Sequence, residues 1–189
     1  MDNIFLYLLG FAGTGKLTIA RAFARSVGAK VVDNHWINNP IFGLIDADGV
    51  SPLPDAVWSQ TAKVREAVLE TIATLAKPRA NFVFTHDGIE GERYDEDVLR
   101  GIQSTAARRG ARLIPVRLVC NEDELVRRIQ SADRAPMLKC TDPADAIHKS
   151  RHHAVLDPRL PGTLTLDATR LTPEQSVEAI IAHIKSLGS

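Results

Sequence analysis

The chain has 189 residues, of which 44% are hydrophobic and 24% charged, a composition typical of one globular domain with its own core. Its 23 lysines and arginines balance 23 aspartates and glutamates, so no overall basic field attracts nucleic acid or an anionic membrane. The apolar run 4–9 is too short to span a membrane, and the acidic Asp2 is unlike the basic start of a secretory signal. Cys120 and Cys140 have neither zinc-site nor redox-motif spacing. We therefore expect a cytoplasmic protein with free thiols, no nucleic-acid partner and no membrane contact.

Continuous apolar runs alternate with amphipathic stripes along the first half of the chain. The run 4–9 ends at Gly10 and has the pattern of a parallel strand buried on both faces. An apolar stripe with helical spacing follows and stops at Gly28. The elements predicted here are a strand at 4–9, a helix at 17–27, a strand at 30–33, an irregular polar stretch at 34–53 and a helix at 54–77. The polar stretch is long for a connection, and such stretches are usually functional or partly helical.

The same alternation continues to the end of the chain. Asn121 and Thr172 are each followed three residues later by Glu or Gln, the spacing of a helix capping box. The predicted elements are a strand at 81–87, a helix at 96–109, a strand at 112–120, a helix at 122–130, a basic segment at 131–142, a helix at 142–156, a strand at 163–167 and a helix at 172–188. Alternating strands and helices predict an α/β fold of three layers, a parallel sheet with helices on both faces. Ligands of such sheets bind beyond the carboxyl ends of the strands.

The strongest motif lies between the first strand and the first helix. Gly10-Phe11-Ala12-Gly13-Thr14-Gly15-Lys16 matches the P-loop pattern G-x-x-x-x-G-K in its expected strand-to-helix setting. Glycines let backbone N–H groups surround phosphate, the helix N-terminus adds partial positive charge, and the lysine ammonium reaches the β- and γ-phosphates. We expect the nucleotide to be bound by Gly10, Ala12, Gly13, Thr14, Gly15, Lys16, Leu17 and Thr18.

One position departs from this pattern. The residue after the lysine is ordinarily Ser or Thr, whose hydroxyl coordinates Mg²⁺, and here it is Leu17. Thr18 carries a hydroxyl, but successive helical residues point about 100° apart, so it does not occupy the same place. We expect Thr18 to contact an α- or β-phosphate while carboxylates or waters hold Mg²⁺.

The chain resembles the adenylate-kinase-like group of P-loop kinases along nearly its whole length. The resemblance rests on the P-loop after the first strand, Asp33 ending the second, Asp87-Gly88 ending the third and an arginine-bearing segment after the fourth. The group includes nucleoside monophosphate kinases, shikimate and gluconate kinases and chloramphenicol phosphotransferase. The resemblance implies a five-stranded parallel sheet in the order 2-3-1-4-5, ATP with Mg²⁺ as phosphoryl donor, and a lid that closes over the phosphates.

Asp33 matches the second-strand aspartate that binds or deprotonates the acceptor hydroxyl in the metabolite kinases. A carboxylate beside an attacking hydroxyl can accept its proton during phosphoryl transfer. The alternative is that Asp33 only caps the segment after it. His35 is a candidate acceptor-binding residue or base, and equally a structural hydrogen-bonding residue.

Asp87 and Gly88 resemble the third-strand Asp-Gly of these kinases, whose carboxylate holds Mg²⁺ through water or orients substrate. Because Leu17 has no hydroxyl, Asp87 becomes the leading candidate for the metal. Nucleoside monophosphate kinases often continue with Pro-Arg to bind the acceptor phosphate, whereas here two glutamates precede Arg93. This favours a neutral or hydroxylated acceptor, with Arg93 as a further candidate for binding it.

The resemblance places a lid at about 127–145. Its arginines would neutralise charge on the transferred phosphoryl group, with Arg128 and Arg134 the best candidates. A basic cluster can also be an ordinary solvated surface, and the other basic residues of this region are Arg127, Lys139 and Arg151.

The sequence favours an ATP-dependent small-molecule kinase that acts as a monomer or homodimer. Because of Leu17, two alternative functions are kept: a nucleotide-binding regulatory module with little transfer activity, and a partner-stimulated NTPase. The sequence does not identify the acceptor, because the acceptor pocket is built by the 34–53 stretch and the following helix. Trp36, Phe42 and Trp58 could be core or ring-stacking residues there, with core the better interpretation for Trp58.

Overall fold

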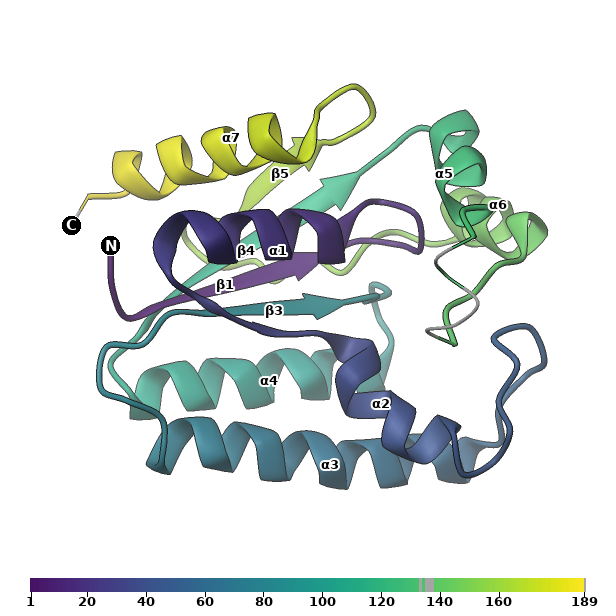
Figure 1. Ribbon diagram of the computed structural model, residues 1–189, viewed down its shortest axis with the longest axis horizontal. Coiled ribbons are helices and arrows are strands. Elements are labelled where there is room, and N and C mark those ends of the chain that lie inside the picture. The colour runs from purple at the N-terminus through teal and green to yellow at the C-terminus, as the bar shows by residue number, and fades with distance from the viewer. Residues whose placement is uncertain (133, 135–137, 189) are drawn as a thin grey trace.

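Five parallel strands form one sheet in the order β2-β3-β1-β4-β5 (Figure 1). The structure is a computed structural model that describes residues 1–132, 134 and 138–188. The strands are β1 Ile4–Leu9, β2 Lys30–Val32, β3 Phe82–His86, β4 Arg112–Val119 and β5 Leu164–Asp167. The predicted fold class and strand order are both confirmed.

Helices cover both faces of this sheet. They are α1 Lys16–Val27, α2 Asn34–Phe42, α3 Asp55–Thr74, α4 Arg93–Arg108, α5 Glu122–Ile129, α6 Pro143–His152 and α7 Pro173–Ser186. Figure 1 shows α1 and α7 on one face, α3 and α4 on the other, and α5 and α6 beyond the carboxyl ends of the strands. The site must therefore lie at the edge that α5, α6 and the connection after α2 surround.

The central strand β1 is buried throughout because it contributes side chains to two cores. Phe5, Tyr7 and Leu9 belong to the core beneath α3 and α4. Ile4, Leu6 and Leu8 belong to the core beneath α1 and α7. Successive strand residues point to opposite faces, so an apolar run without alternation is what a sheet covered on both sides requires.

Two predicted helix caps are confirmed. The Asn121 side chain accepts a hydrogen bond from the N–H of Glu124, 3.0 Å away. At the start of α7, Thr172 and Gln175 form a reciprocal capping box. Such caps satisfy backbone donors that the first helical turn leaves unpaired.

The structure differs from the predicted elements mainly in the 34–53 stretch, whose first part is the helix α2 rather than irregular chain. Ile37 and Phe42 of α2 are buried, and this packing outweighs the weak helix propensity of its Asn and Pro residues. Helix α4 begins earlier than expected, at Arg93. Helix α6 ends at His152, and Val155 beyond it pairs with Ile89 in an isolated antiparallel bridge. Among the described residues, no helix is long and apolar enough to cross a membrane.

Candidate active site

The P-loop is a tight turn between β1 and α1 that glycine makes geometrically accessible. Gly13 and Gly15 have φ angles of 86° and 88°, in the region that side-chain-bearing residues rarely adopt. A Cβ on Gly10 would lie 2.7 Å from the Leu118 carbonyl oxygen and from the Thr14 hydroxyl. The Thr14 hydroxyl is itself buried and donates to the carbonyl of Phe11 at 2.9 Å. The loop is therefore held in shape by its own contacts and by β4.

Lys16, the first residue of α1, is folded back over this loop. Its Nζ donates to the carbonyl oxygens of Gly10 and, at 2.9 Å, of Phe11. Burial lowers the pKa of Lys16 to about 8, although Asp87 and Asp33 raise it. The ammonium is thus held over the loop by neutral carbonyls and lies near carboxylates, so an arriving phosphate would stabilise its charged form.

Leu17 and Thr18 point to different sides of α1, as expected. Leu17 is half-buried and lines the cavity beside Lys16 as well as a groove against Val31 and Trp36. Thr18 is exposed and lines the same cavity and a neighbouring one toward the end of β5. Thr18 therefore lies on the side of α1 toward the end of β5, whereas Leu17 packs toward α2.

Asp33 lies directly after β2, buried and 8% exposed. It occupies the N-cap position of α2, yet its side chain accepts no capping hydrogen bond. Instead its Oδ1 accepts from the hydroxyl of Thr85 on β3, 2.5 Å away. The same hydroxyl oxygen accepts from the N–H of Asn34 at 3.1 Å. The capping alternative is therefore wrong for the side chain, and the carboxylate is held by a neighbouring strand.

His35 follows Asp33 at the start of α2 and lies 3.8 Å from it, Nδ1 to Oδ2. Burial, together with the positive charges of Lys139, Lys16 and Arg134, lowers the pKa of His35 to about 4, although Asp33 raises it. At neutral pH the ring is therefore uncharged. A neutral imidazole with so low a pKa can orient a hydroxyl but is a weak proton acceptor.

Asp87 lies just past β3, half-buried between the P-loop lysine and helix α6. Its Oδ1 is buried and has no hydrogen-bond partner in the described part of the chain. Buried polar atoms without partners are rare, and carboxylate oxygen is the ligand that Mg²⁺ prefers. Asp87 fits a metal-binding role directly or through water.

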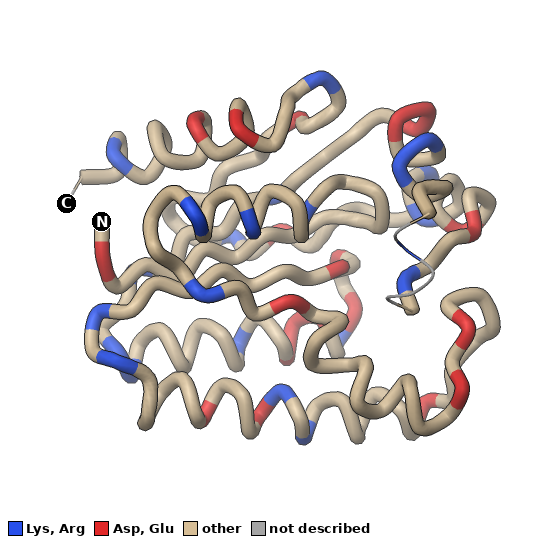
Figure 2. The backbone as a smooth tube through the Cα atoms, viewed as in Figure 1, with Lys and Arg blue, Asp and Glu red and all other residues tan. Residues whose placement is uncertain are grey.

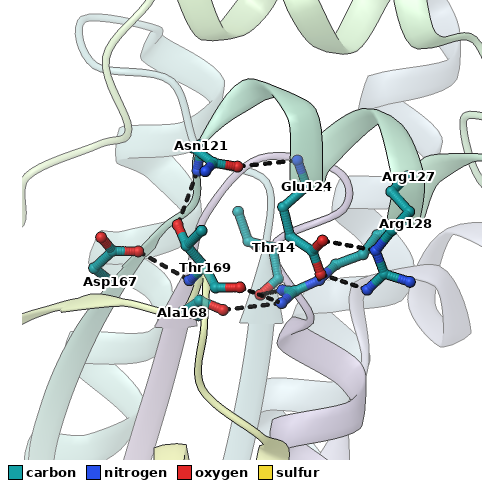
Figure 3. A network of polar contacts seen from close by, with 8 residues as sticks. All are labelled: Thr14, Asn121, Glu124, Arg127, Arg128, Asp167, Ala168 and Thr169. Carbon is teal, nitrogen blue, oxygen red and sulfur yellow. Dashed lines mark hydrogen bonds and ion pairs between the residues drawn. The ribbon is translucent and has the colours of Figure 1, made fainter.

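Arg128 connects three segments around the P-loop (Figure 3). Its guanidinium donates to Glu124 on α5 at 2.6 Å, to the Ala168 carbonyl after β5 at 2.9 Å, and to the Thr14 carbonyl at 3.5 Å. Hydrogen bonds lower the pKa of Glu124 to about 2, and the bond from Arg127 contributes more than that from Arg128. Arg128 thus fixes α5 beside the phosphate loop.

The rest of the predicted lid lies partly outside the described residues, because 133 and 135–137 are not described. Arg134 donates from Nε to the Cys140 carbonyl at 2.9 Å and lines the cavity beside Lys16. Arg127 is 71% exposed and pairs with Glu124. Arg151 pairs with Glu122 on α5, so α6 is attached to the helix that carries the arginines.

Two adjoining cavities meet at the carboxyl edge of the sheet. The smaller of the two, about 290 Å³, is lined by Lys16 with Asp33 and by the basic residues Arg128 and Arg134. We call it the phosphate cavity, for its proposed role. The larger, about 770 Å³, lies between α2, the start of α3 and α6, and we call it the acceptor cavity for the same reason. Asn34, His35, Asp87 and Cys140 line both. The sequence-predicted residues Asp33, His35 and Asp87 therefore lie at or beside the junction.

Two of the predicted acceptor-binding residues lie apart from the others. Arg93 is exposed at the first position of α4 and lines neither of these cavities. Gly88 is buried, and a Cβ there would lie 3.1 Å from Leu9 and 3.2 Å from Leu156. Its role in the structure is therefore close packing between β1 and the segment after α6.

The sequence interpretation missed several residues that shape this junction. One is Thr85, whose hydroxyl donates a hydrogen bond to Asp33. Another is Arg65 of α3, which is buried and donates to the Asn34 side chain at 3.0 Å and to the Tyr94 hydroxyl at 2.7 Å. Both are polar residues inside otherwise apolar patterns, which is the signal that could have identified them. Trp58, interpreted as core, is only half-buried and lines the acceptor cavity.

The five-stranded sheet in the order 2-3-1-4-5, with helices on both faces, is the fold of solved gluconate and shikimate kinases. No family model and no curated protein matches the sequence. Among solved structures, a gluconokinase from Sinorhizobium meliloti is 19% identical with a TM-score of 0.64, over 98% of this chain and 94% of that one. A sugar kinase from Janibacter is 17% identical with a TM-score of 0.65, over 96% and 94%. Shikimate kinase from Acinetobacter baumannii is 17% identical with a TM-score of 0.59, over 98% and 94%. At such identities the likeness establishes the fold.

Proposed function

We propose that this protein is a small-molecule kinase that transfers the γ-phosphoryl group of ATP to a hydroxyl of an acceptor. The observation that carries the proposal is the junction of the two cavities, where Lys16 and Asp33 line the phosphate side and Asp87 lines both. A phosphate-binding loop alone would serve any nucleotide-binding protein. A second cavity that opens onto it beside a held carboxylate supplies a place for an acceptor.

In the proposed reaction, the acceptor hydroxyl oxygen attacks the γ-phosphorus and forms an O–P bond as the bond to the β,γ-bridging oxygen breaks. The hydroxyl proton passes to the carboxylate of Asp33, and ADP leaves with the bonding electron pair. Lys16 holds the β- and γ-phosphate oxygens. The neutral ring of His35 orients the hydroxyl. Positioning and charge stabilisation of this kind account for most catalysis of phosphoryl transfer.

A bound Mg²⁺ would supply positive charge that offsets the charge developing on the phosphate oxygens. The residues present fit such an ion, because Asp87 offers a buried carboxylate oxygen without a partner near Lys16. We assign Asp87 as the metal-binding residue, which takes the place of the hydroxyl that Leu17 lacks. Arg134, which lines the same phosphate cavity, would stabilise charge on the transferred group.

The nucleoside would lie in the cavity of about 360 Å³ that Thr18, Arg127 and Arg128 share with the 168–173 loop. This places the phosphates over the P-loop and the base beside the end of β5. The segment 127–145 would close over the phosphates as a lid.

The proposal is tested by ADP release from ATP and Mg²⁺ with wild-type and Lys16→Ala protein against a panel of hydroxylated acceptors. Stimulation by an acceptor that Lys16→Ala abolishes supports a kinase. Because of Leu17, a regulatory module with little transfer activity is the second candidate. Tight ATP binding that no acceptor converts to turnover would favour it.

A further inference from the structure

The charge that lines the acceptor cavity is predominantly negative. Among the described residues, its acidic side chains are those of Asp55, Asp87, Glu92, Asp95, Asp142 and Asp145, and its one lysine or arginine is Lys149. Figure 2 shows further acidic residues along the connection between α2 and α3, across from the basic residues that follow α5. In a kinase of the proposed kind this cavity selects the acceptor, so the class of acceptor inferred from its charge rests on the proposed function.

Three of these carboxylates already form hydrogen bonds or ion pairs within the protein. Asp95 accepts from the N–H of Ile89 at 2.7 Å and lies 2.7 Å from Nε2 of His86. Asp142 caps α6, where its Oδ1 accepts from the N–H of Ala144 at 2.8 Å. Asp145 pairs with Lys149 at 3.4 Å.

Of the other three, Asp55 and Glu92 are available to the acceptor, whereas Asp87 is the residue assigned to Mg²⁺. Asp55 and Glu92 are exposed and form no hydrogen bond or ion pair through their side chains with any described residue, and Oδ1 of Asp87 is buried without a partner. Asp87 lies at the junction with the phosphate cavity, whereas Asp55 and Glu92 begin or precede the helices α3 and α4. The negative charge that no described partner offsets therefore lies at the outer wall, at Asp55 and Glu92.

The positive charge of Lys149 does not make the lining of the acceptor cavity positive overall. Burial lowers the pKa of Lys149, but Asp87 and Asp145 raise it by more, so it lies above its ordinary value. Carboxylates therefore outweigh desolvation at this position. An ammonium group that is already paired with carboxylates attracts an acceptor carboxylate or phosphate only weakly.

One wall of the cavity is aromatic. The ring of Trp58 lies 6.1 Å from that of Phe42, edge to face, and 5.5 Å from that of Tyr94, between centroids. All three residues line the cavity. Aromatic faces attract ammonium groups through their quadrupole, and adjacent carboxylates add to that attraction. The same wall and carboxylates disfavour an anionic acceptor.

We propose that the acceptor is a hydroxylated amine. Its ammonium group would lie between the carboxylates of Asp55 and Glu92 and the aromatic wall of Phe42, Trp58 and Tyr94, and its reacting hydroxyl would extend to Asp33. The amine stays protonated throughout the reaction, and the transferred phosphoryl group bonds to oxygen.

The first test compares matched acceptors that differ in charge. Glucosamine is measured against N-acetylglucosamine and gluconate, and 2-amino-1,3-propanediol against glycerol and glycerate, by ADP release with ATP and Mg²⁺. We expect kcat/KM for the amine to exceed that of both counterparts by about tenfold or more in at least one set. A neutral or carboxylate compound as the better substrate overturns the amine assignment and leaves the kinase standing. If no compound raises turnover while ATP binds, both proposals fail.

The second test removes the negative charge. The double variant Asp55→Asn/Glu92→Gln should raise KM for the preferred amine about tenfold and leave KM for ATP unchanged, since exposed ion pairs contribute modestly each. Glu66→Gln is the matched control, because Glu66 is exposed on α3 and lines neither cavity. An unchanged KM for the amine in the double variant contradicts the proposal.

Discussion

The hydroxyl of Thr85 and the carboxylate of Asp33 lie 2.5 Å apart and join the ends of β2 and β3. Thr85 donates its one proton to Asp33 and accepts from the N–H of Asn34, so its orientation is fixed from both sides. A carboxylate held in this way needs little reorganisation when it receives a proton from an acceptor. In the proposed reaction, Thr85 is therefore a positioning residue for Asp33.

Replacing Thr85 with valine keeps the shape of the side chain and removes this donor. We expect Thr85→Val to lower kcat about tenfold with little change in KM for ATP, because Asp33 loses its orientation while the P-loop is untouched. Thr85→Ser retains the hydroxyl and should restore most of kcat. Equal losses in the valine and serine variants would show that packing, not the hydrogen bond, matters.

Asp33→Asn tests the proposed proton acceptor. An amide cannot take the hydroxyl proton, so transfer should fall about 100-fold or more, while ATP affinity measured by calorimetry stays within about twofold. Loss of ATP binding in this variant would instead place Asp33 at the metal.

The pKa of Lys16, lowered to about 8, predicts how nucleotide binding depends on pH. Phosphate favours the charged ammonium, so binding is at full strength below pH 8 and weakens above it, by up to about tenfold per pH unit until the pKa of the complex is reached. Calorimetry with ATP between pH 7 and pH 9.5 measures this decline. In Lys16→Arg, whose charge persists over that range, the decline should disappear. The same decline in Lys16→Arg would assign it to another group.

Arg128 and Arg127 form a matched pair on α5. Both donate to Glu124, but only Arg128 also contacts the Ala168 and Thr14 carbonyls. We expect Arg128→Gln to lower the free energy of unfolding by about 2 kcal/mol and to weaken ATP binding, since buried carbonyls lose a charged donor. Arg127→Gln should change neither quantity noticeably, because Arg127 is largely exposed. Denaturant titration and calorimetry compare the two, and equal effects would contradict the role given to Arg128.

Asp87 should determine how much Mg²⁺ the reaction requires. Asp87→Asn removes the charge but retains an oxygen, so the Mg²⁺ concentration for half-maximal ADP release should rise about tenfold at saturating ATP. Glu90→Gln, two residues beyond Gly88, is a control at a side chain that pairs with Arg159 instead. An unchanged Mg²⁺ requirement in Asp87→Asn would remove Asp87 from the metal site.

Patterns of neighbouring residues were sufficient to predict much of the structure of this protein. The apolar run of β1, the glycine spacing of the P-loop and the caps at Asn121 and Thr172 each depend on neighbouring residues, and the structure contains them as predicted. Such features are readable because backbone geometry and burial act over a few positions. The helix α2 was not predicted, because its stability comes from burying Ile37 and Phe42 rather than from its own propensity.

The arrangement of the candidate site depended on tertiary structure. Thr85 meets Asp33 only because β2 and β3 pair in parallel, and the acceptor cavity collects its carboxylates from helices and loops far apart in the chain. Arg93, two residues before Asp95, is exposed while Asp95 is buried, a difference set by which face of α4 packs on the sheet. Local periodicity and glycine spacing thus predicted the alternating strands and helices and the turn after β1, whereas the strand order came from the family resemblance. Only the packing of distant segments decided which polar side chains share one cavity and which sign of charge that cavity presents.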